Sequence, residues 1–231
     1  MDNNNKIIKI YIVILGQWRL YMKYKAIYWF ILSPFIKSYL NIHFSKSQTK
    51  EFTKKAKSFY KDLLAKADDI GEKNPMASNL YFALLLFSFF LPNKANISLD
   101  MFKDLMNYVL NHPFILFFTK CDLNNDKTMN MINKKIKKSA LWAEKNKDKY
   151  PQTWEFNFYD KPREGCAYYF TKCPIAKFFK DNNYEEYTEL FCNLDYIKIA
   201  PSNGILIREH TIAQGDDICD FWIIGNKAKK E

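Results

Sequence analysis

The longest apolar run of the chain constrains the fold more than any other feature. Residues 80–91 read LYFALLLFSFFL, and the run stops at Pro92. A helix that is apolar nearly all round has no face to offer water, so other elements must surround it. We therefore expect a central helix here. Both this run and the shorter one at Ile27–Leu32 fall well below the roughly 20 apolar residues that a spanning helix needs, so no transmembrane segment is predicted.

Other segments before residue 150 also predict helices. Apolar residues recur at helical spacing over 48–67 and 126–147, with lysines on the opposite faces. Residues 6–32 predict a long, mostly buried helix, which Ser33–Pro34 should end or kink because proline disfavours a helical conformation in the residue before it.

Two polar residues are placed to start helices. Asn74–Pro75 has the form of an N-cap and first-turn pair for the central helix. Ser98 can cap a further helix that ends near Asn111.

Strand signals appear only after about residue 150. Trp154, Phe156 and Phe158 alternate with polar residues, which is the period of a half-buried strand. The same reasoning predicts strands over 166–172, 205–211 and 218–224, with short helices over 174–179 and 184–194.

The sequence therefore predicts an α+β fold, in which a helical N-terminal part packs on a small antiparallel sheet with two short helices inserted. The helical part is expected over 1–150, the α+β part over 151–226, and a basic tail over 227–231. No repeat or flexible linker separates the parts, so we expect them to share one core.

Composition excludes several function classes. The chain has only 6 glycines and no GxGxxG or GxxxxGK[ST] pattern, which argues against Rossmann and P-loop nucleotide sites. The net charge of +10 comes mostly from lysine runs without a nucleic-acid motif. We interpret these runs as solvated surface and expect no nucleic-acid partner. Peripheral membrane contact through the N-terminal helix stays an alternative.

The five cysteines do not fit a small secreted disulfide scaffold, because their number is odd and the chain is long. No secretory signal is recognised at the N-terminus, where no small-residue cleavage site follows residues 7–15. We expect reduced thiols in a cytoplasmic protein. The cysteines are Cys121, Cys166, Cys173, Cys192 and Cys219.

The residues that can carry chemistry gather in the α+β part. Tyr169–Phe170–Thr171–Lys172–Cys173–Pro174 is followed by Cys192–Asn193–Leu194–Asp195, then by residues 208–215 (REHTIAQG), then by Cys219–Asp220–Phe221. This ordered set resembles the L-2-amino-thiazoline-4-carboxylic acid hydrolase family. The apolar ending Trp222–Ile223–Ile224 departs from the family pattern, which has a basic residue after the Cys-Asp-Phe triplet.

The resemblance implies hydrolytic ring opening of an aminothiazoline carboxylate to a carbamoyl-cysteine. We accordingly expect a hydrolase that opens a C–N bond of a small cyclic amidine or isothiourea acid and takes a small-molecule carboxylate as substrate, with no cofactor. A zinc site is an alternative, since Cys, His and Asp ligands are present, but no CxxC or HxxxH spacing supports it.

The chemistry of an electrophilic ring carbon suggests roles for individual residues. A thiolate or an activated water must attack, and a proton must reach the departing atom. Cys173 at a predicted helix start and Cys192 are the candidate nucleophiles, and Asp195 is the candidate acid or base. The predicted substrate-binding residues are Arg208, whose guanidinium can hold a carboxylate, His210 and Thr211. The predicted structural motif is Gly215, Cys219, Asp220 and Phe221.

Each of these residues also has a purely structural interpretation. Cysteine often behaves as a small core side chain, and this is the favoured interpretation of Cys219. Asp195 can cap a helix, Arg208 can be an exposed strand residue, and Gly215 can serve a turn with positive φ. Two further functions therefore stay open: a non-catalytic small-molecule-binding module resembling vinyl-reductase-type ligand-binding domains, and a peripheral membrane or interaction protein built on the basic helical part.

Overall fold

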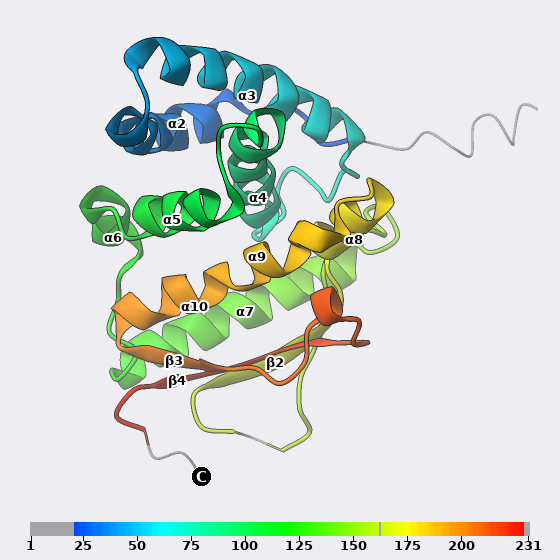
Figure 1. The fold of residues 1–231 in the computed structure, drawn as a ribbon. Coiled ribbons are helices and arrows are strands. Elements are labelled where there is room, and N and C mark those ends of the chain that lie inside the picture. Colours follow the sequence, from blue (N-terminus) through cyan, green and yellow to red (C-terminus); the bar gives the residue numbers. More distant parts are fainter. Residues whose placement is uncertain (1–20, 162, 229–231) are drawn as a thin grey trace, which may run out of the picture.

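A computed structural model describes residues 21–161 and 163–228, and their elements form three layers (Figure 1). Helices α2 to α6 form one outer layer, α7 and the run α8–α10 form the middle, and the sheet forms the other outer layer. The helices are α2 (Ala26–His43), α3 (Lys46–Lys66), α4 (Ala77–Phe90), α5 (Leu99–Leu110), α6 (Pro113–Thr119), α7 (Asp126–Asn146), α8 (Pro174–Asp181), α9 (Thr188–Cys192) and α10 (Leu194–Ile199). Short 3-10 turns are η1 (Leu91–Asn93), η2 (Glu185–Tyr187), η3 (Ala200–Ser202) and η4 (Ile212–Gln214).

The sheet has four antiparallel strands in the order β1-β2-β4-β3. The strands are β1 (Glu155–Asn157), β2 (Cys166–Lys172), β3 (Gly204–Ile207) and β4 (Cys219–Gly225). Register pairs Tyr168 with Phe221 and Phe170 with Cys219, so aromatic and thiol side chains share one face of the two central strands. This face points at the middle helices, because its side chains are buried. The predicted α+β class with an antiparallel sheet is confirmed.

Helix α4 lies at the centre of the molecule, as its sequence predicts. Eleven of its residues are buried, from Ala77 to Phe90. Phe87, fully buried, contacts the rings of Phe179, Tyr184 and Phe191, which come from the α8–α9 region. The hydrophobic cluster that surrounds α4 includes residues from before and after position 150.

Helix α2 corrects the prediction for the N-terminal region. Residues 6–20 of the predicted helix lie outside the described residues, and 21–25 are not helical. The helix then continues past Pro34 to His43, so Ser33–Pro34 does not end it, and the alternative of a kink stays a prediction. Pro34 cannot donate to the carbonyl of Phe30. Both residues are exposed, so water can satisfy that carbonyl while the opposite face of α2 stays in the core.

Strand β3 is shorter than predicted, because it stops at Ile207 and leaves Arg208 to Thr211 outside it. The reason lies in Asp220, whose carboxylate accepts the amides of Glu209 at 3.1 and 3.2 Å and of His210 at 2.8 Å. Those amides are therefore not free to extend the ladder. The predicted helix over 184–194 is likewise divided into η2, α9 and the start of α10.

Helix α4 begins at Ala77, two residues after Pro75, while Asn74 caps the preceding turn by accepting the amide of Met76 at 2.9 Å. Helix α6 is not predicted: its sequence is apolar on every side, and none of its residues is buried. Helices α3, α5 and α7 and strand β2 match their predicted spans to within two residues. Within the described ranges, no helix is both long enough and apolar enough to span a bilayer.

Candidate active site

A cavity of about 380 Å³ lies between the sheet and the helices. Its floor is the buried face of β2 and β4, and its walls come from α4, α7 and the run α8–α10. Most of its lining is aromatic or aliphatic, for example Phe82, Leu86, Phe170 and Phe191. Its polar side chains are Asn79, Lys135, Tyr168, Cys173, Cys192, Asp195, Lys198 and Cys219.

Two thiols meet at the floor of this cavity. Cys192 is the last residue of α9 and Cys219 is the first residue of β4. Their side chains are hydrogen-bonded to each other, and Cys219 also accepts the backbone amide of Ile212. Hydrogen bonds to the charged form favour it, so the pair concentrates thiolate character on Cys219.

The pKa values of the pair follow from these contacts. The Cys192 hydrogen bond lowers the pKa of Cys219, with the positive charge of Arg208 acting in the same direction and burial opposing both. The pKa of Cys192 is raised by its hydrogen bond to Cys219 and by burial. Cys219 is thus the thiol that loses its proton first, which makes it the better nucleophile of the two.

Arg208 fixes the wall beside the thiols. Its side chain is 2% exposed, and Nη2 lies 3.0 Å from Oδ2 of Asp195. Nε donates to the carbonyl of Asp220 and Nη1 to the carbonyl of Cys192, both at 3.0 Å. The guanidinium also lies 4.0 Å above the ring of Phe221. Arg208 therefore ties α9, α10 and β4 together and orients the Asp195 carboxylate at the cavity.

A model of the L-2-amino-thiazoline-4-carboxylic acid hydrolase family matches residues 99–223, more than half of the chain. The protein belongs to this family. The matched range contains both thiols of the floor, Asp195 and Arg208, whereas α4 lies before it. No curated protein and no solved structure matches the chain.

Cys173 is the third thiol that lines the cavity, and it occupies the N-cap position of α8 without a side-chain capping hydrogen bond. The amides of Ile175 and Ala176 point at it, as expected at a helix start. Burial nevertheless outweighs them and raises the pKa of Cys173 to about 11. The helix start therefore acts in the predicted direction but is outweighed by burial, and the catalytic role of Cys173 stays a prediction.

The segment after β3 forms a tight turn rather than a binding strand. His210 is exposed, with Nδ1 3.6 Å from Oδ2 of Asp216. Asp216 also accepts the amide of Thr211 at 2.9 Å. Gly215 has φ +96°, which confirms the turn interpretation of that residue.

Thr211 and Arg208 line a separate hollow of about 100 Å³ on the other side of Cys192. The hydroxyl of Thr211 is buried without a hydrogen-bond partner. The structure thus brings Cys173, Cys192 and Asp195 to one cavity and leaves Arg208 behind its wall. Arg208 is held away from the cavity because its donors are directed at Asp195 and at two carbonyls.

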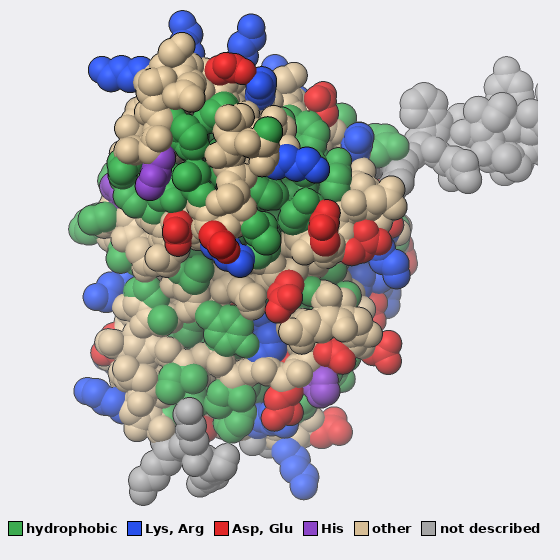
Figure 2. All heavy atoms as spheres, in the orientation of Figure 1, with side chains coloured by type: hydrophobic (Ala, Val, Ile, Leu, Met, Phe, Trp, Pro, Cys, Tyr) green, Lys and Arg blue, Asp and Glu red, His purple; other side chains and the backbone are tan. Residues whose placement is uncertain are grey.

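Two functional candidates were missed by sequence reasoning. Lys135 of α7 and Lys198 of α10 both line the cavity, and both are exposed. Lys135 belongs to a lysine run interpreted as solvated surface, and Figure 2 shows lysine and arginine side chains dispersed over the visible face. One signal could have found Lys198: it lies three residues after Asp195, hence on the same helix face.

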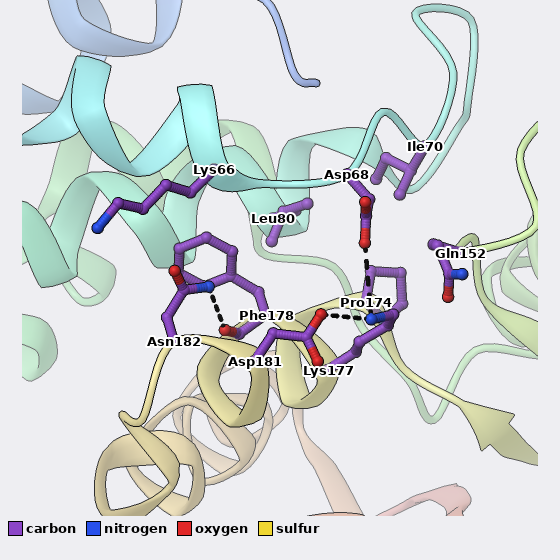
Figure 3. Close-up of a pocket in the computed structure, with 10 residues that line it drawn as sticks. All are labelled: Lys66, Asp68, Ile70, Leu80, Gln152, Pro174, Lys177, Phe178, Asp181 and Asn182. Carbon is purple, nitrogen blue, oxygen red and sulfur yellow. Dashed lines mark hydrogen bonds and ion pairs between the residues drawn. The ribbon is translucent and has the colours of Figure 1, made fainter. Parts of the chain in front are cut away.

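A small hollow of about 10 Å³ beside α8 has a structural role (Figure 3). Lys177 of α8 pairs there with Asp181 and lies 3.7 Å from Oδ2 of Asp68, which follows α3. The hollow has room for about one water molecule, so it marks an ionic contact between α8 and the helical part. Among the described residues, no three His, Cys, Asp or Glu side chains come together in a way that could hold a metal ion.

Proposed function

We propose that this protein hydrolyses a ring C–N bond of a small cyclic amidine or isothiourea acid. The observation that carries the proposal is the hydrogen-bonded thiol pair Cys192–Cys219 beside Asp195 in one cavity, inside the matched family range. A nucleophile next to a donor and a carboxylate is what ring opening requires.

The reaction balances with one water per turnover. The Cys219 thiolate adds to the carbon between nitrogen and sulfur, and the ring nitrogen departs with a proton as an amine. Water then adds to the same carbon, and the Cys219 thiolate leaves. We assign the proton transfers to Asp195: it passes the proton released by the Cys219 thiol to the departing nitrogen in the first step, and it takes a proton from the attacking water in the second. The product is a carbamoyl compound, and the enzyme is regenerated.

The test is mass spectrometry of the purified full chain with aminothiazoline carboxylate and related cyclic amidines. We expect a mass gain of one water with release of an amine. Cleavage of the C–S bond would release a thiol instead, which a thiol reagent detects in the separated product. A thiol product would overturn the C–N assignment, and no mass change with any of these acids would overturn the proposal.

A non-catalytic small-molecule-binding module is the second candidate. The observation that favours it is the predominantly aromatic and aliphatic lining of the cavity. Binding of an acid without any change in its mass, in both the native chain and a Cys219→Ala variant, would support this alternative.

A further inference from the structure

The cavity is large for the substrate that the family name implies. An aminothiazoline carboxylate has about nine non-hydrogen atoms, whereas cavities of roughly 300–1,000 Å³ take drug-sized ligands. This cavity measures about 380 Å³. A small polar ring would leave much of the space unfilled.

The unfilled space is apolar. Its walls include Phe82, Ala83 and Leu86 of α4 and Ile132 and Ile136 of α7. Apolar walls gain most from apolar ligand surface, because each buried methylene is favourable and each unpaired polar group is costly.

The cavity is also lined by two cationic side chains. Lys135 and Lys198, from two different helices, both line it and both reach solvent. Asp195 is already paired with Arg208 at 3.0 Å, while Lys198 Nζ is 4.0 Å from its other oxygen. The two lysines are therefore the groups that can meet an acid.

The thiol of Cys192 and the cation of Lys198 are separated along the helical run α9–α10. Cys192, Asp195 and Lys198 follow each other at three-residue spacing on the face of α9–α10 that lines the cavity. At 1.5 Å per residue, Cys192 and Lys198 are about 9 Å apart along the run. This separation suits a ligand longer than an aminothiazoline ring.

We propose that the cavity binds amphipathic organic acids, with the acid group at Lys135 and Lys198 and an apolar body larger than a thiazoline ring against α4 and α7. The inference rests on the proposed function only for the location of its site. It makes the substrate a cyclic isothiourea or amidine acid that carries an apolar substituent.

The experiment is calorimetric titration of the full chain with straight-chain carboxylates from butanoate to octanoate. We expect the affinity to rise about fourfold per added methylene. Octanoate should bind about tenfold more tightly than 1-octanol, because only the acid meets the lysines. Equal affinities along the series, or equal binding of octanol and octanoate, would overturn the inference.

Two controls locate the binding. A Lys135→Met/Lys198→Met variant should lose the preference for octanoate over octanol, and Lys134→Met, an exposed neighbour on α7, should keep it. Octanoate should also slow alkylation of Cys219, the cavity thiol whose pKa is lowered, but not of Cys121. Equal effects of the lysine variants, or no protection of Cys219, would place the acid elsewhere and overturn the inference.

The outcome is separable from that of the proposed function. Octanoate binding as described, with no turnover of any cyclic isothiourea acid, would reject the hydrolase and keep this inference. Turnover of aminothiazoline carboxylate, with carboxylate affinity independent of chain length, would keep the hydrolase and reject this inference.

Discussion

The helical part and the sheet part bury polar groups in different ways. In the helical part, the neutral side-chain amides of Asn74 and Asn93 each donate to the carbonyl four residues before, at 2.8 and 2.9 Å, and also to a distant partner, the hydroxyl of Thr153 at 2.8 Å and the carbonyl of Phe52 at 3.4 Å. In the sheet part, Arg208 and the carboxylate of Asp220 join segments that are 10 to 16 residues apart. The buried bonds are thus made by neutral amides in one part and by charged groups at the wall of a cavity in the other.

This difference indicates where each part is sensitive. In the helical part, α4 is enclosed by apolar contacts. The free energy of unfolding lost on truncating one of its buried side chains should therefore increase with the volume removed. In the sheet part, buried charge and thiols border an open space, an arrangement that costs stability unless every partner is present. The comparison predicts that catalytic activity, and the stability contributed by buried ionic groups, both depend on the sheet part.

The largest expected effect is on turnover. Cys219→Ala should lower kcat/KM for ring opening by at least about a thousandfold, because it removes the attacking thiolate. Cys192→Ala should have an intermediate effect, since it removes only the hydrogen bond to that thiolate, and Cys173→Ala should stay within about tenfold. Steady-state kinetics on the folded variants measure this.

Cys166→Ala is the matched control, because Cys166 is a buried β2 thiol outside the cavity lining and its loss should leave kcat/KM unchanged. Unchanged activity in Cys219→Ala and Cys192→Ala together would leave water, activated by Asp195, as the attacking group.

The next effect is on the free energy of unfolding. Arg208→Met should cost about 3 kcal/mol, because it leaves the Asp195 carboxylate and two carbonyls without their partner. Asp195 is 30% exposed, so water recovers part of the loss. Arg163→Met is the matched control: its guanidinium lies 4.1 Å above the Tyr159 ring on an exposed residue, and its loss should cost under about 1 kcal/mol. Urea unfolding measures both, and equal costs would contradict the comparison.

The third effect is alkaline destabilisation of the sheet part. Burial raises the pKa of Cys166 and of Cys173 to about 11, from an ordinary 9.0. The folded state therefore holds these protons longer than the unfolded state does, and the stability they contribute is present below pH 9 and lost as the pH rises toward 11. The loss should be on the order of 3 kcal/mol for each thiol, and Cys166→Ala should remove the share of Cys166.

Cys219 has the opposite sign, because its pKa is lowered. The stability that it contributes is present above the unfolded-state pKa and is lost as the pH falls through the folded-state value. Activity should therefore rise with pH and level off below the pKa of an ordinary thiol. A plateau reached only above pH 9 would mean that Cys219 is not the nucleophile.

Local sequence patterns determined the elements well, because short-range sterics and burial set them. The predicted strand over 166–172 coincides with β2, and the run 80–91 forms most of α4. The continuation of α2 past Pro34 shows that tertiary packing can override a local conformational preference. The sequence does not say which face of α2 meets solvent, and that face decides whether the proline is tolerated.

The site was less predictable, because it depends on the register of the sheet. Cys192 and Cys219 are hydrogen-bonded only because β4 begins beside the end of α9. The end of β3 determines whether the Arg208 side chain points at a substrate or into the cavity wall. Lys135 and Lys198 come together at the cavity only because α7 and α10 both pack over the sheet. No spacing in the sequence carries that information.

The smallest expected effect concerns the ionic contact between the two parts (Figure 3). Lys177→Met removes the pairs with Asp68 and Asp181 while keeping the side-chain stem, and Lys177 is 31% exposed. Partly exposed pairs of this kind contribute little, so the free energy of unfolding should fall by about 0.5 to 1 kcal/mol, and less at high salt. Lys180→Met, on an exposed position of the same helix, should cost less still. Apolar contacts such as that between the rings of Phe87 and Phe179 would then hold α8 to α4. A cost equal to that of Arg208→Met, measured by urea unfolding at low and high NaCl, would mean that the two parts are joined ionically and would remove the contrast between them.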